Sequence, residues 1–147
     1  MSKIRYVMCD NGYDQKVVGA VLDEKLVGYA RYKIENREAW LYNIKVNEEF
    51  RHLKDEKIGS HLLQIVENEC IARWVDHIEG KYYPETEDAI VRSFYAKNGF
   101  EVVRDDYDLI IWKTLFRDKK HNLDVQVEDI DYSQYQSYEG EDKEDEM

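Results

Sequence analysis

The sequence predicts an α/β fold in which a mixed, mostly antiparallel sheet is flanked by two main helices. Four strand-like segments follow one another within the first 46 residues, before any helical periodicity appears. A segment with apolar residues at three- and four-residue steps comes next, and a second helix is indicated by capping and acidic residues at its start and a glycine at its end; each is followed by further strand-like sequence. The chain has 147 residues, of which 43% are hydrophobic, so it is long enough to bury one core of this kind.

The first four strands form a run without an intervening helix. Apolar and β-branched residues dominate each segment, and turn-forming residues separate the segments. We expect these strands at 3–8, 17–22, 26–34 and 39–46. Alternate residues of the fourth strand are apolar and are expected on one face of the sheet: Trp40, Tyr42, Ile44 and Val46.

Two helices and three strands are expected in the second half of the chain. The first helix is predicted over 57–74, where apolar residues recur along one face. The residues of this apolar stripe are Ile58, Leu62, Ile65, Val66, Cys70 and Trp74. A strand at 77–83 stops at Pro84, and a second helix at 87–97 ends at Gly99, as is typical of a helix C-terminus. The last two strands are expected at 100–103 and 109–115.

The net charge of −11 is concentrated at the C-terminal end. From Asp124 onward there are ten acidic residues and one lysine, a net charge of −9, so the preceding residues carry 22 acidic and 20 basic residues, a net charge of −2. We therefore divide the chain into a domain at 1–122 and an acidic, tyrosine-containing tail at 123–147. Within the tail, 123–127 is a candidate edge strand, and the polar sequence from residue 131 predicts disorder. Such a tail most often keeps a protein soluble; the alternatives are that it recognises a basic partner, folds over the open face of the domain, or imitates nucleic acid.

Composition argues against several classes of function. The nearly neutral body lacks the cationic surface that phosphate contact requires, so we expect no nucleic-acid binding there. No apolar run approaches the length of a membrane span, and the first residues lack the apolar stretch of a signal peptide. Cys9 and Cys70 are too few for a disulfide framework and belong to no Cys/His set with metal-ligand spacing. We expect a reduced, cytoplasmic protein without a metal.

The residues between the fourth strand and the first helix have the features of an anion site. The strand ends at Val46, and a charged loop leads to a helix whose first backbone amides and dipole favour a bound anion. Gly59 lets the backbone approach a phosphate closely, and the Ser60 hydroxyl adds a donor. The alternative interpretation of the cations in this loop is a solvated surface; they are Arg51, His52, Lys54 and Lys57.

A second motif, Phe94-Tyr-Ala-Lys-Asn-Gly-Phe100, joins the end of the second helix to the next strand. Together with the anion site, this motif resembles the coenzyme-binding half of the Gcn5-related (GNAT) acetyltransferase superfamily. The resemblance covers roughly 16–115 and is strongest at 41–66 and 90–103. It implies the fold predicted above, in a form adapted to coenzyme A.

The resemblance also implies a short form of the family. GNAT proteins usually have one or two helices between their first two strands, and these helices wall the acceptor pocket. Here only about eight residues, at 9–16, separate the two strands. The acceptor side is therefore expected to be reduced, shallow and open.

The resemblance implies acetyl-CoA as co-substrate. Backbone groups of Ile44 and Val46 are then expected to face the pantetheine arm, and backbone amides at the start of the first helix to hold the pyrophosphate. These amides belong to Ile58, Gly59, Ser60 and His61. The loop is three residues longer than the family pattern, so the cation that meets the phosphates is either Arg51 or Lys54. Lys57 occupies the first glycine position of the motif, where it adds charge but gives up backbone freedom.

Tyr95 is the candidate catalytic residue. In the family, the tyrosine at this position commonly protonates the departing thiolate, and a phenol can do so when held within hydrogen-bond reach. The alternative is a buried tyrosine with a structural partner. The usual glutamate base corresponds to Trp40, which cannot accept a proton. The candidates for a substitute base remain open; they are Glu38, Tyr42, His61 and Asp88.

The implied function is direct transfer of acetyl from acetyl-CoA to a primary amine. An open acceptor side favours a lysine or an N-terminus on a macromolecular partner over a small enclosed amine. The alternative is a catalytically weak or inactive binding or decoy protein that acts through its open face or its acidic tail. Lys57, Trp40 and the acidic tail favour the decoy, whereas Tyr95 and Gly59 favour the enzyme. Open edges at both ends of the sheet favour a homodimer as a further partner.

Overall fold

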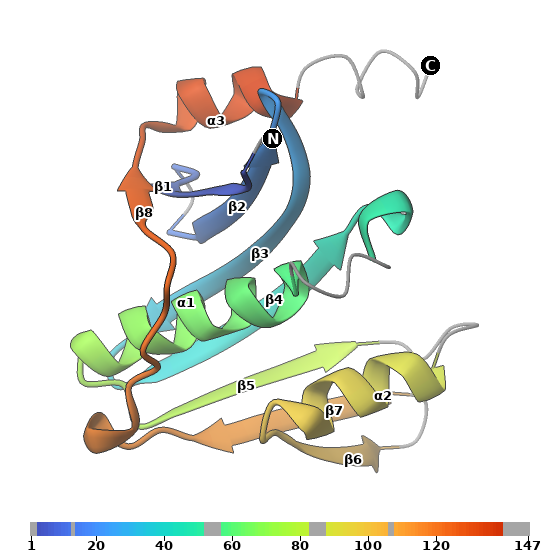
Figure 1. Cartoon of the computed structure of the whole chain (residues 1–147). Coiled ribbons are helices and arrows are strands. Elements are labelled where there is room, and N and C mark those ends of the chain that lie inside the picture. The colour runs from blue at the N-terminus through green and yellow to red at the C-terminus, as the bar shows by residue number, and fades with distance from the viewer. Residues whose placement is uncertain (1–2, 13, 52–56, 83–87, 106–107, 140–147) are drawn as a thin grey trace.

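The structure is a computed structural model that describes residues 3–12, 14–51, 57–82, 88–105 and 108–139. Its eight strands form one sheet in the order β6-β7-β5-β4-β3-β2-β1-β8 (Figure 1). The β4–β5 and β1–β8 pairs are parallel and the other described pairs are antiparallel. The predicted mixed, mostly antiparallel α/β fold is therefore confirmed.

The elements follow the predicted order along the chain. The first four strands are β1 (Arg5–Asp10), β2 (Lys16–Leu22), β3 (Lys25–Glu35) and β4 (Glu38–Val46). The later strands are β5 (His77–Tyr82), β6 (Glu101–Asp105), β7 (Asp108–Thr114) and β8 (Val127–Asp129). The helices are α1 (Ile58–Ala72), α2 (Asp88–Lys97) and α3 (Tyr132–Glu139), with single-turn 3-10 helices η1 (Glu48–Phe50) and η2 (Arg117–Lys119).

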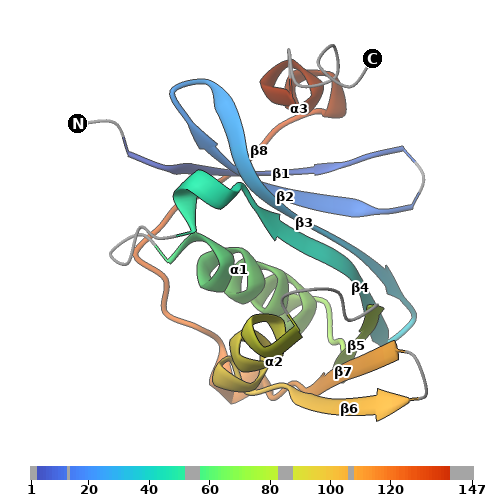
Figure 2. The same cartoon turned by 90° about the vertical axis from the view of Figure 1, so that its right-hand side faces the viewer.

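Helices lie on both sides of the sheet. Figure 2 shows α1 and α2 on one side and α3 on the other, over the first strands. The apolar stripe of α1, including Leu62 and Val66, packs on inward residues of β2 to β4 such as Ala30 and Leu41. This packing forms the larger core, because the alternating strand residues and the helical stripe each present one apolar face.

The sequence prediction for Trp74 is wrong. Trp74 was expected on the buried stripe of α1, but its side chain is 57% exposed and its backbone φ is 66°. The helix ends at Ala72, and the chain turns back so that Val75, not Trp74, enters the core. The Trp74 ring instead stacks with Arg117, whose guanidinium carbon lies 3.1 Å from the ring centroid.

The prediction that Trp40, Tyr42, Ile44 and Val46 share one face of β4 is wrong, because the strand contains a β-bulge. Arg31 of β3 pairs with Asn43 and Tyr32 pairs with Leu41, so Tyr42 has no opposite residue on β3. The extra residue shifts the alternation by one. Trp40 and Tyr42 are therefore exposed, whereas Ile44 and Val46 pack against the core on the other face.

The tail is partly ordered, contrary to the predicted disorder from residue 131. A strand forms at β8 rather than at 123–127 and pairs in parallel with β1. In α3, Tyr135 and Tyr138 are buried against the far face of β1 to β3. Tyrosines three residues apart share one side of a helix, which gives this polar segment an apolar face. The division at residue 122 stays a prediction, and 140–147 lie outside the described residues.

Candidate functional site

The candidate site begins where β4 and β5 separate. These parallel strands pair from Glu38 with His77 to Leu41 with Gly80, and β4 then continues to Val46 while β5 continues to Tyr82 (Figure 1). Within the described residues, no pairing joins the two strands beyond Leu41. Beyond Leu41, this side of β4 is therefore free of strand pairing within the described residues, so its backbone groups can bind an extended ligand. The contacts of Ile44 and Val46 with the pantetheine arm stay a prediction.

The N-terminus of α1 opens beside the end of β4. The first intrahelical bond runs from the His61 amide to the Lys57 carbonyl at 3.0 Å. The amides of Ile58, Gly59 and Ser60 precede it, and no side-chain cap is found on this helix end in the part of the chain that the structure describes. Three of the four predicted amides are therefore available for an anion, while that of His61 is used within the helix.

Lys57 adopts the left-handed conformation, with φ 46° and ψ 47°. This is the region that glycine enters readily and other residues enter at a cost of roughly 1–2 kcal/mol. The chain thus keeps at Lys57 a backbone that suits the glycine of the family motif. The lysine adds a cation at the same point.

Gly59 allows α1, α2 and β4 to meet. A Cβ atom on Gly59 would lie 3.1 Å from Cε1 of Phe94 and 3.7 Å from Cγ2 of Val46. The position therefore has a packing role in addition to the predicted approach to phosphate. Asn98, at the end of α2, donates to the Ser60 hydroxyl at 3.4 Å, which links the same two helices. Sequence reasoning missed these contacts of Phe94 and Asn98.

His61 turns its side chain toward β1. Its Nδ1 lies 3.1 Å from the hydroxyl of Tyr6, and the two rings are perpendicular with centroids 5.7 Å apart. Tyr6 is 2% exposed, so the pair sits at the boundary between α1 and the core. The structure thus gives His61 an interaction with Tyr6 that the sequence did not suggest.

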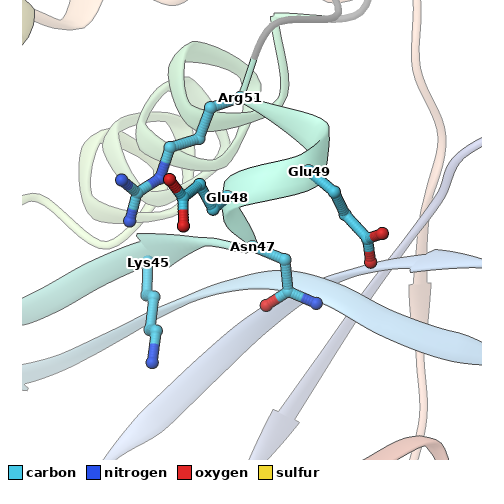
Figure 3. Close-up of a pocket in the computed structure, with 5 residues that line it drawn as sticks. All are labelled: Lys45, Asn47, Glu48, Glu49 and Arg51. Atoms are coloured by element: carbon cyan, nitrogen blue, oxygen red, sulfur yellow. The ribbon is translucent and has the colours of Figure 1, made fainter.

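Arg51 lies at the end of β4, where its Nε donates to the Val46 carbonyl at 2.9 Å. Figure 3 shows the Arg51 and Lys45 side chains at a pocket of about 660 Å³. The pocket is lined by Lys45, Asn47, Glu48, Glu49 and Arg51. Of the two predicted phosphate-binding cations, Arg51 is therefore close to the strand end, and Lys54 lies outside the described residues. Lys45 is a second cation here that the sequence did not single out.

Tyr95 is buried within a cluster of aromatic rings. Its ring centroid is 5.7 Å from that of Tyr82, 5.2 Å from Phe94 and 5.6 Å from Phe100. Burial, with a smaller contribution from Tyr82, raises the pKa of the Tyr95 hydroxyl and keeps it protonated at neutral pH. Tyr82 is the last residue of β5, so this cluster lies beside the gap between β4 and β5.

The structure does not single out a base. Trp40 and Tyr42 are 37% and 39% exposed, and Glu38 is exposed at the start of β4. No described hydrogen bond, ion pair or ring contact joins Glu38, Tyr42 or His61 to Tyr95. The side chain of Asp88 lies outside the described residues.

Neither cysteine forms a disulfide bond in the described residues. Cys9 and Cys70 are free and buried, and burial raises their pKa to about 11 and about 12.

Among the described residues, no group of three or more His, Cys, Asp or Glu is placed to hold a metal ion. None of the described helices is both long enough and apolar enough to span a membrane. The cytoplasmic location stays a prediction.

Comparison with known proteins identifies the family. The profile described as "Acetyltransferase (GNAT) domain" matches residues 13–102, well over half of the chain. The chain belongs to the GNAT acetyltransferase family. The predicted family resemblance is therefore confirmed, and so is its short form, because only residues 11–15 separate β1 from β2.

Several members of the family are similar to this chain. A spermidine N(1)-acetyltransferase of Thermoplasma acidophilum is 32% identical over 100 residues, which are 68% of this chain and 59% of that protein. The crystal structure of PaiA N-acetyltransferase from Thermoplasma acidophilum in complex with coenzyme A has a TM-score of 0.60 at 29% identity, and the match covers 69% of this chain and 61% of that one. The chain thus spans about three fifths of the length of these two GNAT relatives.

A third similarity concerns the fold alone. The ribosomal-protein-S18-alanine N-acetyltransferase from Escherichia coli has a TM-score of 0.59 at 18% identity, and the match covers 76% of this chain and 77% of that one. The arrangement of strands and helices in this GNAT chain is therefore shared with proteins of very different sequence.

Proposed function

We propose that this protein transfers an acetyl group from acetyl-CoA to an amine. The observation that carries the proposal is the separation of β4 from β5 after Leu41 and Gly80, with the N-terminus of α1 beside the end of β4. The gap suits an extended pantetheine arm, and the helix end suits a pyrophosphate. Membership of the GNAT family and the coenzyme A in the PaiA complex support the same assignment.

The proposed coenzyme contacts follow from this geometry. Backbone groups of Ile44 and Val46 bind the pantetheine amides, and the amides of 58–60 bind the pyrophosphate. Arg51, Lys54 and Lys57 supply positive charge for the phosphates, with Arg51 already held at the carbonyl of Val46. No metal takes part in these contacts.

The proposed reaction is a direct transfer. The lone pair of a neutral amine attacks the acetyl carbonyl carbon, the new C–N bond forms, and the C–S bond breaks. The hydroxyl of Tyr95 donates its proton to the departing thiolate, and the proton lost by the amine passes to solvent or to a base. The position of Tyr95 supports this role, because its ring stacks on Tyr82, the last residue of β5, beside the gap between β4 and β5.

The proposed acceptor is a lysine or an N-terminus on a macromolecular partner. The connection at 11–15 is too short to form a helical wall over the acceptor side, so a large partner has access to it. The names of relatives allow two kinds of acceptor, because one acts on spermidine and another on a ribosomal protein. The absence of a helical wall at 11–15 on the acceptor side favours the protein acceptor.

A second candidate function is a binding or decoy protein with the same fold. A lysine, Lys57, at the glycine position of the motif, Trp40 at the position of the usual base, and the acidic tail support this alternative. A homodimer through the edge strands β6 or β8 remains a prediction for either function.

The experiment that separates the two functions is calorimetric titration of acetyl-CoA into the wild type and Tyr95→Phe, with thiol release followed in the same samples. Binding by both proteins, with slow coenzyme hydrolysis lost in Tyr95→Phe, supports the transferase. Tyr135→Phe is the matched control, because Tyr135 is a buried tyrosine of α3 on the other side of the sheet. No binding at millimolar acetyl-CoA would contradict the transferase and favour the decoy.

A further inference from the structure

Over β4 to β7, one face of the sheet is left uncovered by the described helices. Figure 2 shows α1 and α2 on one side of β4 to β7, while α3 lies over β1 to β3 on the opposite side. The side of β4, β5, β7 and β6 that faces away from α1 and α2 is termed the open face. Its residues are Lys33 on the adjoining part of β3, and Glu38, Trp40, Tyr42, His77, Glu79, Lys81, Glu101, Val103, Ile110, Trp112 and Thr114.

The open face contains a row of alternating charged and aromatic side chains. Trp40 pairs with Lys33 on β3 and with Glu79 on β5. Glu79 pairs with Trp112 on β7, and Trp112 pairs with Glu101 on β6. Paired residues project to the same face, so the order across five strands is Lys33, Trp40, Glu79, Trp112 and Glu101.

The spacing of this row suits a cation. Neighbouring strands lie about 4.8 Å apart, so the backbones of Trp40 and Trp112 are about 10 Å apart, with Glu79 midway. A cation above the Glu79 carboxylate is then flanked by the two tryptophan strands, each about 4.8 Å away, and an indole that leans towards Glu79 brings its ring centroid within the roughly 6 Å of a cation–π contact. Both indoles are 37% exposed and Glu79 is 40% exposed, so all three are accessible.

The charge of the open face is negative once its internal pairs are counted. Lys33 lies 3.1 Å from Glu35, and Lys81 lies 3.0 Å from Asp108, so both lysines have a carboxylate partner. Glu79 contacts His77 at 3.3 Å, whereas Glu38 and Glu101 have no lysine or arginine partner among the described residues. A hollow of about 320 Å³ between β3, β4 and β5 is lined by Glu35, Glu38, Trp40, Tyr42 and Glu79, together with Lys33, Asn36 and Ala39.

We infer that the open face binds a basic segment of the acceptor protein, with a lysine or arginine side chain held over Glu79 between Trp40 and Trp112. This inference rests on the proposed transferase function, whose acceptor it specifies. The row lies one residue before the point where β4 and β5 separate, so a segment bound there lies next to the opening assigned to the acetyl group.

A protein segment fits this surface better than a free polyamine. The apolar residues extend beyond the row to Tyr42, which is 39% exposed, and to Val103, which is 52% exposed. They lie on β4, β7 and β6, on either side of β5, and this surface contacts a small amine from one side only. An extended basic segment covers the apolar residues and meets the carboxylates at the same time.

The test measures binding of a dye-labelled lysine-containing peptide with blocked ends to the full chain by fluorescence anisotropy. Glu79→Gln and Trp112→Leu are each expected to weaken binding about tenfold, and acetylation of the peptide lysines to weaken it at least as much. Glu101→Gln, an exposed position in the same row, is a second charge variant. The matched controls are Glu24→Gln and Trp74→Leu, which alter an exposed glutamate and an exposed tryptophan outside the open face.

Each outcome decides between the alternatives. Equal peptide affinity in Glu79→Gln, Glu101→Gln, Trp112→Leu and the wild type would overturn the inference. If spermidine displaces the peptide at a concentration equal to or lower than that of the peptide, the open face binds a free polyamine. The inference that it binds a protein segment is then overturned. Acetyl-CoA is titrated into the same proteins. If the wild type does not bind acetyl-CoA but its peptide binding depends on Glu79, the transferase fails and the docking surface stands.

Discussion

The ammonium of Lys113 lies 2.7 Å from Oε1 of Glu67, a carboxylate that is 1% exposed in the middle of α1. The same oxygen lies 2.9 Å from Nε2 of His121, and Lys113 also donates to the carbonyl of Asn98 at the end of α2. Asn68, the neighbour of Glu67, exchanges two hydrogen bonds with the backbone of His121. One buried glutamate therefore joins α1, α2, β7 and the segment that leads to the tail.

Removing the charge of Glu67 is expected to destabilise the protein. Breaking a buried ion pair costs about 3–5 kcal/mol, because the partner charges remain without compensation. We expect Glu67→Gln to lower the free energy of unfolding in urea by about 3 kcal/mol. Glu24→Gln is the control, since Glu24 is 74% exposed in its pair with Arg5 and should change stability by less than about 1 kcal/mol. Equal small effects of both variants would contradict the buried network.

Lys57 offers a direct test of the helix entry. Lys57→Gly should raise the free energy of unfolding by up to about 1 kcal/mol, because the gain from relieving a left-handed residue exceeds the flexibility cost of glycine. Lys57→Ala removes the same charge but keeps a Cβ atom, so its stability should stay near that of the wild type. Calorimetry with acetyl-CoA should show equal weakening in both variants if the charge contacts phosphate. Unchanged affinity in both would argue against that contact.

Tyr135 tests whether the tail is part of the folded protein. Its side chain is fully buried, and a Cβ atom on Gly19 of β2 would lie 3.0 Å from its ring. Tyr135→Ala should lower the free energy of unfolding by about 3–5 kcal/mol, as for other large aromatic truncations. Tyr135→Phe should be neutral or stabilising, because the buried hydroxyl has no hydrogen-bond partner among the described residues. Urea unfolding compares the two, and equal stabilities would contradict docking of α3.

Because thiols and phenols are buried in the folded protein, we expect the protein to lose stability at alkaline pH. Burial raises the pKa of Cys70 from its ordinary 9.0 to about 12, so the folded state holds this proton more tightly than the unfolded chain does. The stabilisation is complete below pH 9 and is lost as pH rises from 9 toward 12. Tyr32 and Tyr135, whose pKa values burial also raises, add to the loss above their ordinary 10.0.

Urea unfolding between pH 8 and pH 11 measures this dependence. Each group that titrates only in the unfolded chain should contribute a slope of up to about 1.4 kcal/mol per pH unit. Cys70→Ala should reduce the slope just above pH 9, before the tyrosines of the unfolded chain titrate. An identical slope in Cys70→Ala and the wild type would show that another group is responsible.

Local patterns predicted most of the secondary structure. The strands and the first two helices appear where alternation or helical periodicity was visible, because these periods follow from backbone geometry alone. The errors fall where a distant partner decides. Tyr42 bulges because β3 lacks a residue opposite it, and Tyr135 orders the tail because β1 to β3 offer an apolar face. The spacing of the tail tyrosines was a usable signal, but the acidic composition outweighed it.

The candidate site was predicted in part. Lys57, Gly59 and Tyr95 stand in motifs that can be read along the chain, but their neighbours come from other elements. Phe94 contacts Gly59 across two helices, and Tyr6 meets His61 from a strand 55 residues away in the sequence. The open face similarly depends on the register of five strands.

The sequence by itself determined the order of the elements, the family motifs and the chemical groups at the helix entry, because these depend on neighbours along the chain. Only the tertiary structure decided which surfaces those groups share. It separated β4 from β5 and aligned Trp40, Glu79 and Trp112 in one row. It also enclosed Glu67 between Lys113 and His121. The physical reason is that strand register and burial arise from packing between segments far apart in the chain, which local periodicity does not encode.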